Sequence, residues 1–70
     1  MKPPLSVSAW PLDGNAWLAL TREALDAAKV DTEAIDRWFA SAVGRRTLPQ
    51  IQDACLPVLA RHYTVTGGPA

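Results

Sequence analysis

Few residues of this chain are of types that carry catalytic or metal chemistry. Cys55 and His62 are its only cysteine and its only histidine. They lie seven positions apart on one face of a predicted helix, which separates them by roughly 10 Å along the axis. No second residue of either type completes a metal set. Three carboxylates gather at a predicted helix start, where they match the helix dipole: Asp31, Glu33 and Asp36. The sequence therefore predicts no enzyme activity, metal, cofactor or small-molecule substrate.

The composition indicates a small, electrically balanced domain. The chain has 70 residues, of which 49% are hydrophobic, enough for one core. Seven basic residues balance seven acidic ones, so the net charge is zero. A dedicated nucleic-acid binder carries a positive excess for its phosphate contacts. The balance therefore favours a protein partner over direct sequence-specific DNA binding.

Compartment signals point to the cytoplasm. A lone cysteine excludes a disulfide framework and fits a reducing environment. The apolar runs are far shorter than the roughly 20 residues that span a bilayer. No basic segment followed by an apolar one marks a secretory signal. We therefore expect a cytoplasmic protein with no membrane partner.

The middle of the chain predicts two amphipathic helices. Asn15 is placed to cap the first, over about residues 16–28. Its apolar side consists of Trp17, Leu20, Ala24, Leu25 and Ala28. Asp31 or Thr32 caps the second, which Gly44 ends. The i, i+3, i+4, i+7 stripe of the second helix is Ile35, Trp38, Phe39 and Ala42.

A third helix begins at "TLPQ". Thr47 and Gln50 have the spacing of a capping box, and Pro49 fits the first turn. The expected buried face is Ile51, Cys55, Val58, Leu59 and His62. Pro57 stands inside this helix, so we expect a kink or break near Asp53.

The segment "KPPLSVSAWPL", residues 2–12, predicts a strand-like arm. Its prolines disfavour a helix, and apolar residues alternate with serines over residues 5–9. A single strand leaves its backbone groups unpaired. The arm therefore has three options. It packs on its own helices through Trp10 and Leu12, it pairs with the tail strand "HYTVT", or it adds to a sheet edge of another protein.

We expect a mixed form in which Trp10 and Leu12 anchor the arm and residues 5–9 bind a partner. The predicted contact residues are Leu5, Ser6, Val7, Ser8 and Ala9, with Trp10 as anchor. A Val7→Asp change should then abolish partner binding and leave thermal unfolding nearly unchanged. The predicted fold is all-α: a compact three-helix, helix-turn-helix-like domain over residues 13–66. It carries an extended docking arm over residues 1–12 and a flexible tail over residues 67–70.

The stretch "TREALDAAKVDTEAIDRWF" followed by "GRRTLPQIQDAC" resembles the helix-turn-helix of Cro-like regulators. Lys29 stands where that family has a glycine for its left-handed turn, and Leu25 where it has a small residue. The resemblance implies a DNA-binding repressor whose base-reading residues are Thr32, Glu33, Asp36 and Arg37. That face carries more acids than bases, which favours the same packing without DNA.

In length, helical plan and arm, the chain also resembles small phage proteins that bind bacterial RNA polymerase. That resemblance implies docking on a large polymerase subunit in the host cytoplasm, which inhibits initiation, suppresses termination, or does both. Arg45 and Arg46 would form an electrostatic rim or contact nearby nucleic acid. The leading hypothesis is a polymerase-binding transcription regulator. The alternatives are a Cro-like repressor and an inhibitor of another host protein complex.

Overall fold

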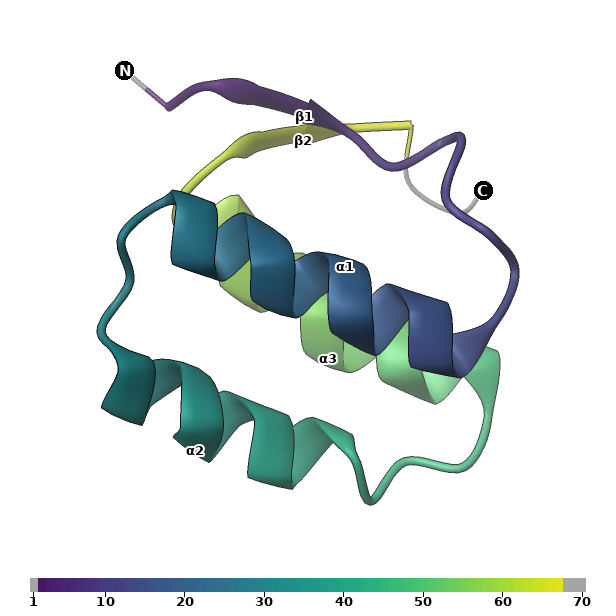
Figure 1. The fold of residues 1–70 in the computed structure, drawn as a ribbon. Coiled ribbons are helices and arrows are strands. Elements are labelled where there is room, and N and C mark those ends of the chain that lie inside the picture. Colours follow the sequence, from purple (N-terminus) through teal and green to yellow (C-terminus); the bar gives the residue numbers. More distant parts are fainter. Residues whose placement is uncertain (1, 68–70) are drawn as a thin grey trace.

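The computed structural model describes residues 2–67, which form three helices and a two-stranded sheet. The sheet lies on one side of the α1 and α3 pair, and α2 lies on the other (Figure 1). The predicted three helices are confirmed, but the all-α class omits the strand pair. In chain order the elements are β1 (Pro4–Ser6), α1 (Gly14–Ala27), α2 (Thr32–Ala42), α3 (Leu48–Ala60) and β2 (Thr64–Thr66).

Helix α1 is capped by Asp13, two residues before the predicted cap. The Asp13 carboxylate accepts a hydrogen bond of 3.3 Å from the Ala16 amide. Asn15 instead lies inside the first turn and is exposed. The helix starts at Gly14, where a Cβ atom would collide with the Ile51 side chain of α3. The glycine therefore allows the start of α1 to approach α3 closely.

The turn between α1 and α2 is a Schellman motif. The Val30 amide donates to the Leu25 carbonyl at 3.1 Å, and the Lys29 amide to the Asp26 carbonyl at 3.0 Å. Lys29 has a φ of 61°, the left-handed conformation that glycine adopts without strain. The turn therefore has the backbone that the helix-turn-helix resemblance requires, with a lysine in the strained position.

Helix α3 confirms its predicted start and corrects the predicted break. Thr47 and Gln50 form the full capping box, with Pro49 in the first turn. The helix continues through Pro57 to Ala60 without interruption. Proline removes one hydrogen bond from the helix interior. We attribute the continuity to the buried residues on the opposite side of α3, such as Cys55 and Leu59.

The arm pairs with the tail strand, one of the three options for its backbone. β1 and β2 are parallel, with Leu5 opposite Val65. The ladder extends beyond the strands through a 2.9 Å bond from the Thr64 amide to the Pro3 carbonyl and a 3.0 Å bond from the Val7 amide to the Thr66 carbonyl. These bonds join residues near the two ends of the described chain, so the arm is part of the fold.

The core lies between the sheet, α1 and α3, and the end of α2 contributes Ala42 to it. Its buried residues are Val7, Trp17, Leu18, Ala42, Ile51, Cys55 and Leu59. Two expectations about the arm need correction. Leu12 is 84% exposed, so it anchors nothing, and Val7 is 2% exposed, so it belongs to the core. Apart from Gly67, the predicted flexible tail lies outside the described residues.

Candidate functional site: a groove between two helices

The predicted contact strip of the arm is divided between the core and the solvent. Leu5 is half-buried and Val7 fully buried, both against the core. Ser6 and Ser8 are exposed, and their hydroxyls hydrogen-bond each other at 3.0 Å. Ala9 lies exposed in a turn that follows β1. The strip therefore offers a partner two serines and an alanine, with no large apolar side chain.

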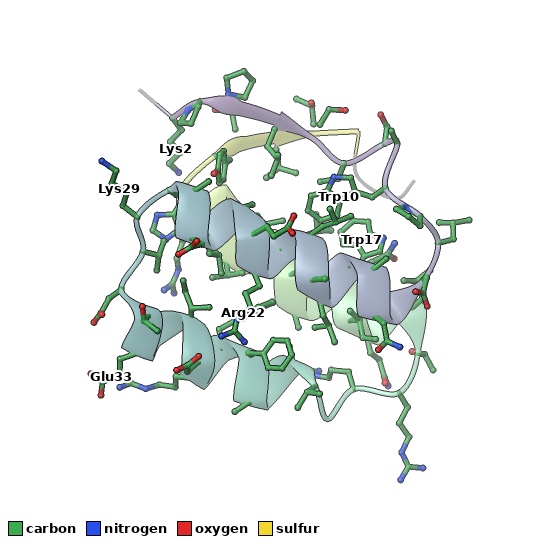
Figure 2. The ribbon with its side chains drawn as sticks, in the orientation of Figure 1. Lys2, Trp10, Trp17, Arg22, Lys29 and Glu33 are labelled. Atoms are coloured by element: carbon green, nitrogen blue, oxygen red, sulfur yellow. The ribbon has the colours of Figure 1, made fainter. Side chains whose placement is uncertain are left out.

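Trp10 takes the anchoring place that the sequence predicts for it. It is half-buried and meets Trp17 edge-to-face, with ring centroids 4.8 Å apart. Figure 2 shows the two rings together beneath the sheet, beside the first half of α1. Aromatic pairs in this geometry stabilise a fold beyond the area they bury. Trp10 therefore attaches the arm to the protein's own core.

The outer edge of β1, which faces away from β2, is open but short. The Pro3 carbonyl and the Val7 amide point to β2. Backbone directions alternate along a strand, so the polar groups of Pro4 and Ser6 point to the outer edge. Proline has no amide hydrogen. This edge therefore presents the amide and carbonyl of Ser6 and the carbonyl of Pro4, a small template for strand addition.

A groove with a volume of about 530 Å³ lies between α2 and α3. We call it the α2–α3 groove. On α2 it follows a helical stripe that includes Ala34, Trp38 and Ser41. On α3 it follows a second stripe that includes Ala54, Pro57 and Arg61. The two helices run in opposite directions across Figure 1, and the two stripes form the walls of one groove.

Trp38 fixes the floor of the groove and ties its two walls together. Its indole Nε1–H donates a 2.8 Å hydrogen bond to the Ala54 carbonyl. The ring is half-buried and meets Phe39 edge-to-face at 6.1 Å. Leu25 and Ile35, both buried, line the groove below it. The floor is therefore apolar and held in place by a directional bond.

The rim of the groove carries three arginines against one acid. Arg37, Arg45 and Arg61 line it together with Asp53. Arg37 lies 3.6 Å from Glu33, but both side chains are about four-fifths exposed, and such pairs are weak. Among the described residues, Arg45 and Arg61 form no ion pair. A chain of zero net charge thus places a local positive excess around the α2–α3 groove.

The structure separates the two arginines that the sequence paired. Arg45 lines the groove, whereas Arg46 does not, and only the backbone amide of Arg46 makes a bond, to the Gln50 side chain at 3.2 Å. Arg61 was not among the site residues predicted from the sequence, and Arg37 was predicted on a different surface. The sequence did contain a signal for this wall of the groove. A spacing of four residues predicts that Asp53, Pro57 and Arg61 share one helix face.

The base-reading face implied by the Cro-like resemblance is exposed on α2. Its residues are Thr32, Glu33, Asp36 and Arg37. Asp36 pairs with Arg22 at 3.3 Å, and the Arg22 guanidinium also lies 5.2 Å from the centroid of Phe39. Figure 2 shows Arg22 extending from α1 toward α2. Three of the four residues are therefore engaged in ion pairs within the domain, Asp36 with Arg22 and Glu33 with Arg37.

The remaining chemistry-bearing groups are scattered. Burial raises the pKa of the Cys55 thiol, and the neighbouring Thr21 hydroxyl partly offsets this. A small hollow of about 190 Å³ lies beside Trp17, whose Nε1 is buried without a hydrogen-bond partner. Within residues 2–67, no three potential ligands gather to hold a metal ion. No helix in that range has the length and apolarity to cross a membrane.

Comparison of the chain with models of protein families, with characterised proteins and with solved structures finds no match. The main features of the candidate site are an apolar floor set by Trp38, two helical walls and an arginine rim.

Proposed function

We propose that this chain is a non-enzymatic transcription regulator that acts by binding a protein, with bacterial RNA polymerase as its partner. The observation that carries the protein-binding part is the α2–α3 groove, whose apolar floor is surrounded by arginines. Protein interfaces have this plan, with a desolvated centre and a polar rim. Tryptophan and arginine are enriched among the residues that dominate binding energy. Trp38 and Arg45 are the first candidates of each type.

The size of the domain limits how it binds. A standard interface buries about 800 Å² on each partner. The described chain exposes 4629 Å², so such an interface covers about a sixth of it. The groove must then bind together with its rim and the exposed parts of α2 and α3. In the proposed mechanism, occupying one polymerase surface in this way displaces an initiation factor or changes termination.

Polymerase is the proposed partner because of the resemblance to small phage regulators in length, helical plan and arm. That resemblance implies docking through the N-terminal arm. The outer edge of β1 keeps this route open as a second contact, since Ser6 presents both backbone groups there. The groove offers the larger apolar area, so we place the main contact there and the arm at its periphery.

The binding test uses purified bacterial core polymerase immobilised on a biosensor. Arg45→Glu should weaken binding at least about tenfold, which corresponds to about 1.4 kcal/mol. Arg46→Glu is the matched control, because it makes the same charge change one residue outside the groove, and it should alter binding less than about threefold. In transcription assays, the wild-type protein should lower initiation or raise terminator read-through, and the Arg45 variant should not.

A proline pair tests the arm. Ser6→Pro removes only an amide that points away from β2, so the fold should tolerate it, as edge strands tolerate proline. Leu5→Pro removes an amide that points to β2 and should destabilise the fold. Weaker polymerase binding by Ser6→Pro at unchanged stability would assign the outer edge to the interface.

Absence of binding to core polymerase and holoenzyme would refute the polymerase assignment. A shift of duplex DNA at low salt, with a steep salt dependence, would then move the function to the Cro-like alternative. Binding to neither would leave an inhibitor of another host complex as the remaining alternative.

A further inference from the structure

We infer that the α2–α3 groove binds one class of ligand, an acidic amphipathic α-helix of the partner. The inference rests on the proposed function only in assuming that a partner protein exists. Three features of the groove lead to it: its length, the small side chains on its walls, and the sign of its rim charge.

The length of the groove matches two turns of a helix. The stripe from Ala34 to Ser41 spans about 10 Å along α2, at 1.5 Å per residue. The stripe from Asp53 to Arg61 spans about 12 Å along α3. A helix that lies between two helices presents anchors at i, i+3 or i+4, and i+7, which cover the same two turns. The groove therefore accommodates three or four anchoring side chains.

The walls are built from small side chains over a large aromatic floor. Ala34 and Ser41 line the groove on α2 and Ala54 lines it on α3, while the Trp38 indole reaches across to the Ala54 carbonyl. Small wall residues leave room above the ring for a leucine-sized or phenylalanine-sized anchor. Val58, also half-buried, extends the apolar surface along α3. Covering this floor removes apolar area from water, which stabilises the complex.

The charge of the rim selects an acidic helix. Because α2 and α3 are antiparallel, Arg45, which follows the end of α2, and Arg61, which follows the end of α3, lie toward opposite ends of the groove, with Arg37 near the middle of α2. Among residues 2–67, Asp53 is the only acidic residue that lines it. Carboxylates on the flanks of the bound helix would pair with these guanidinium groups, which form bidentate bonds with carboxylates. A basic helix would place like charges together and would be rejected.

Pro57 adds a polar feature to the same wall. It lacks an amide hydrogen, so the Asp53 carbonyl receives no helical bond from the residue four positions later. Both residues line the groove. The free carbonyl is a fixed acceptor for a hydroxyl or amide side chain of the bound helix. The chain thus offers an apolar floor, cationic ends and one defined acceptor.

The test uses two synthetic helical peptides of about four turns with the same leucines at i, i+3, i+4 and i+7. One carries glutamates on its flanks and the other carries lysines. In NMR titrations, the indole N–H signals of the three tryptophans show where on the protein the peptide binds. The glutamate peptide should shift the Trp38 signal and leave Trp10 and Trp17, on the sheet side, nearly unchanged. It should bind at least about tenfold tighter than the lysine peptide, and less tightly as salt is raised.

Matched variants connect the binding to the rim. The double change Arg45→Glu and Arg61→Glu should weaken binding of the glutamate peptide at least about tenfold. Arg46→Glu should change this affinity less than about twofold. Each protein is first checked by its Trp38 signal and thermal unfolding. Equal binding of the lysine peptide, shifts at Trp10 in place of Trp38, or no binding of the glutamate peptide would each overturn the inference. Tighter binding of a single-stranded oligonucleotide in the groove would overturn it as well.

Polymerase binding distinguishes this inference from the proposed function. If the glutamate peptide binds the groove but polymerase does not bind the protein, the inference holds and the polymerase assignment fails. If polymerase binds the protein and the saturating peptide does not compete, with no Trp38 shift on peptide addition, the assignment holds and the inference fails.

Discussion

The two sides of α3 have opposite properties. The side toward α1 and the sheet carries Ile51, Cys55 and Leu59, all buried. The side toward the groove carries Asp53, Pro57 and other exposed or half-buried residues. One helix therefore stabilises the fold with one face and provides a binding wall with the other. Substitutions on the two faces should separate stability from binding.

The same contrast distinguishes α1 from α2. Helix α1 buries Trp17, Leu18, Thr21 and Leu25, whereas α2 buries only Ile35 and Ala42. Polar contacts supplement the attachment of α2, through the Trp38 bond to Ala54 and the ion pair between Arg22 and Asp36. An exposed ion pair stabilises little. One wall of the groove is thus the helix with the smaller buried core.

The largest effect is expected at Val7, on the buried side. Val7→Asp places a charge at a site that is 2% exposed, with no cation paired to it. It should cost about 4 kcal/mol or more and unfold this small domain, as seen by circular dichroism on heating. The strip hypothesis predicted unchanged unfolding. Ser6→Asp, one residue away on the exposed face, should change stability by less than about 0.5 kcal/mol. A stable Val7→Asp protein would contradict the core assignment.

Adjacent residues on α3 provide the next comparison. Leu59→Ala removes a fully buried side chain and should lower the free energy of unfolding by about 3 kcal/mol. Val58→Ala shortens a half-buried groove residue and should lower the free energy of unfolding by about 1 kcal/mol. It should also weaken binding of the glutamate peptide. Urea titrations measure the free energy of unfolding, and NMR titrations measure the affinity for the peptide. Similar losses of stability at both positions would remove the distinction between the two faces.

A substitution in the turn that leads into α2 should raise the stability of the fold. Lys29→Gly relieves a side chain held at a φ of 61°, a conformation that costs L-residues about 1 kcal/mol or more. Glycine also increases the entropy of the unfolded chain, so we expect a net gain of about 1 kcal/mol or less. Thermal unfolding should show it, and Lys29→Ala, which keeps a Cβ atom, should not. If Lys29→Gly lowered the stability, a contact of the lysine side chain would have to stabilise the fold by more than the left-handed conformation costs.

The smallest predicted effect is an alkaline loss of stability that originates at Cys55. Burial raises the pKa of this thiol in the folded state, so folding favours its protonated form. That contribution is fully present below the ordinary thiol pKa of about 8.5 and is lost as pH rises through the folded value. The unfolding free energy of the wild type should therefore fall more between pH 8 and pH 10 than that of Cys55→Ala. Parallel urea curves for the two proteins would exclude the thiol as the source.

The local structure could be predicted from the sequence. The capping box at Thr47 and Gln50, the amphipathic stripe through Ile35 and Trp38, and the three helices all depend on residues within one or two turns of each other. The alternation over residues 5–9 predicted a strand, which is confirmed for Leu5 and Ser6 but not for Ser8 and Ala9, which lie in a turn. Local prediction was wrong where two neighbouring residues compete, as Asp13 and Asn15 do for the cap of α1.

Only the tertiary structure decided which surface remains free. Alternation shows that Leu5 and Val7 share a face, but a partner's core and the protein's own core can cover that face equally well. Pairing of β1 with β2, across nearly the whole described chain, brought Val7 inside. The groove likewise requires Arg45 and Arg61 to approach from different helices. Such contacts depend on the packing of distant segments, which no local pattern specifies.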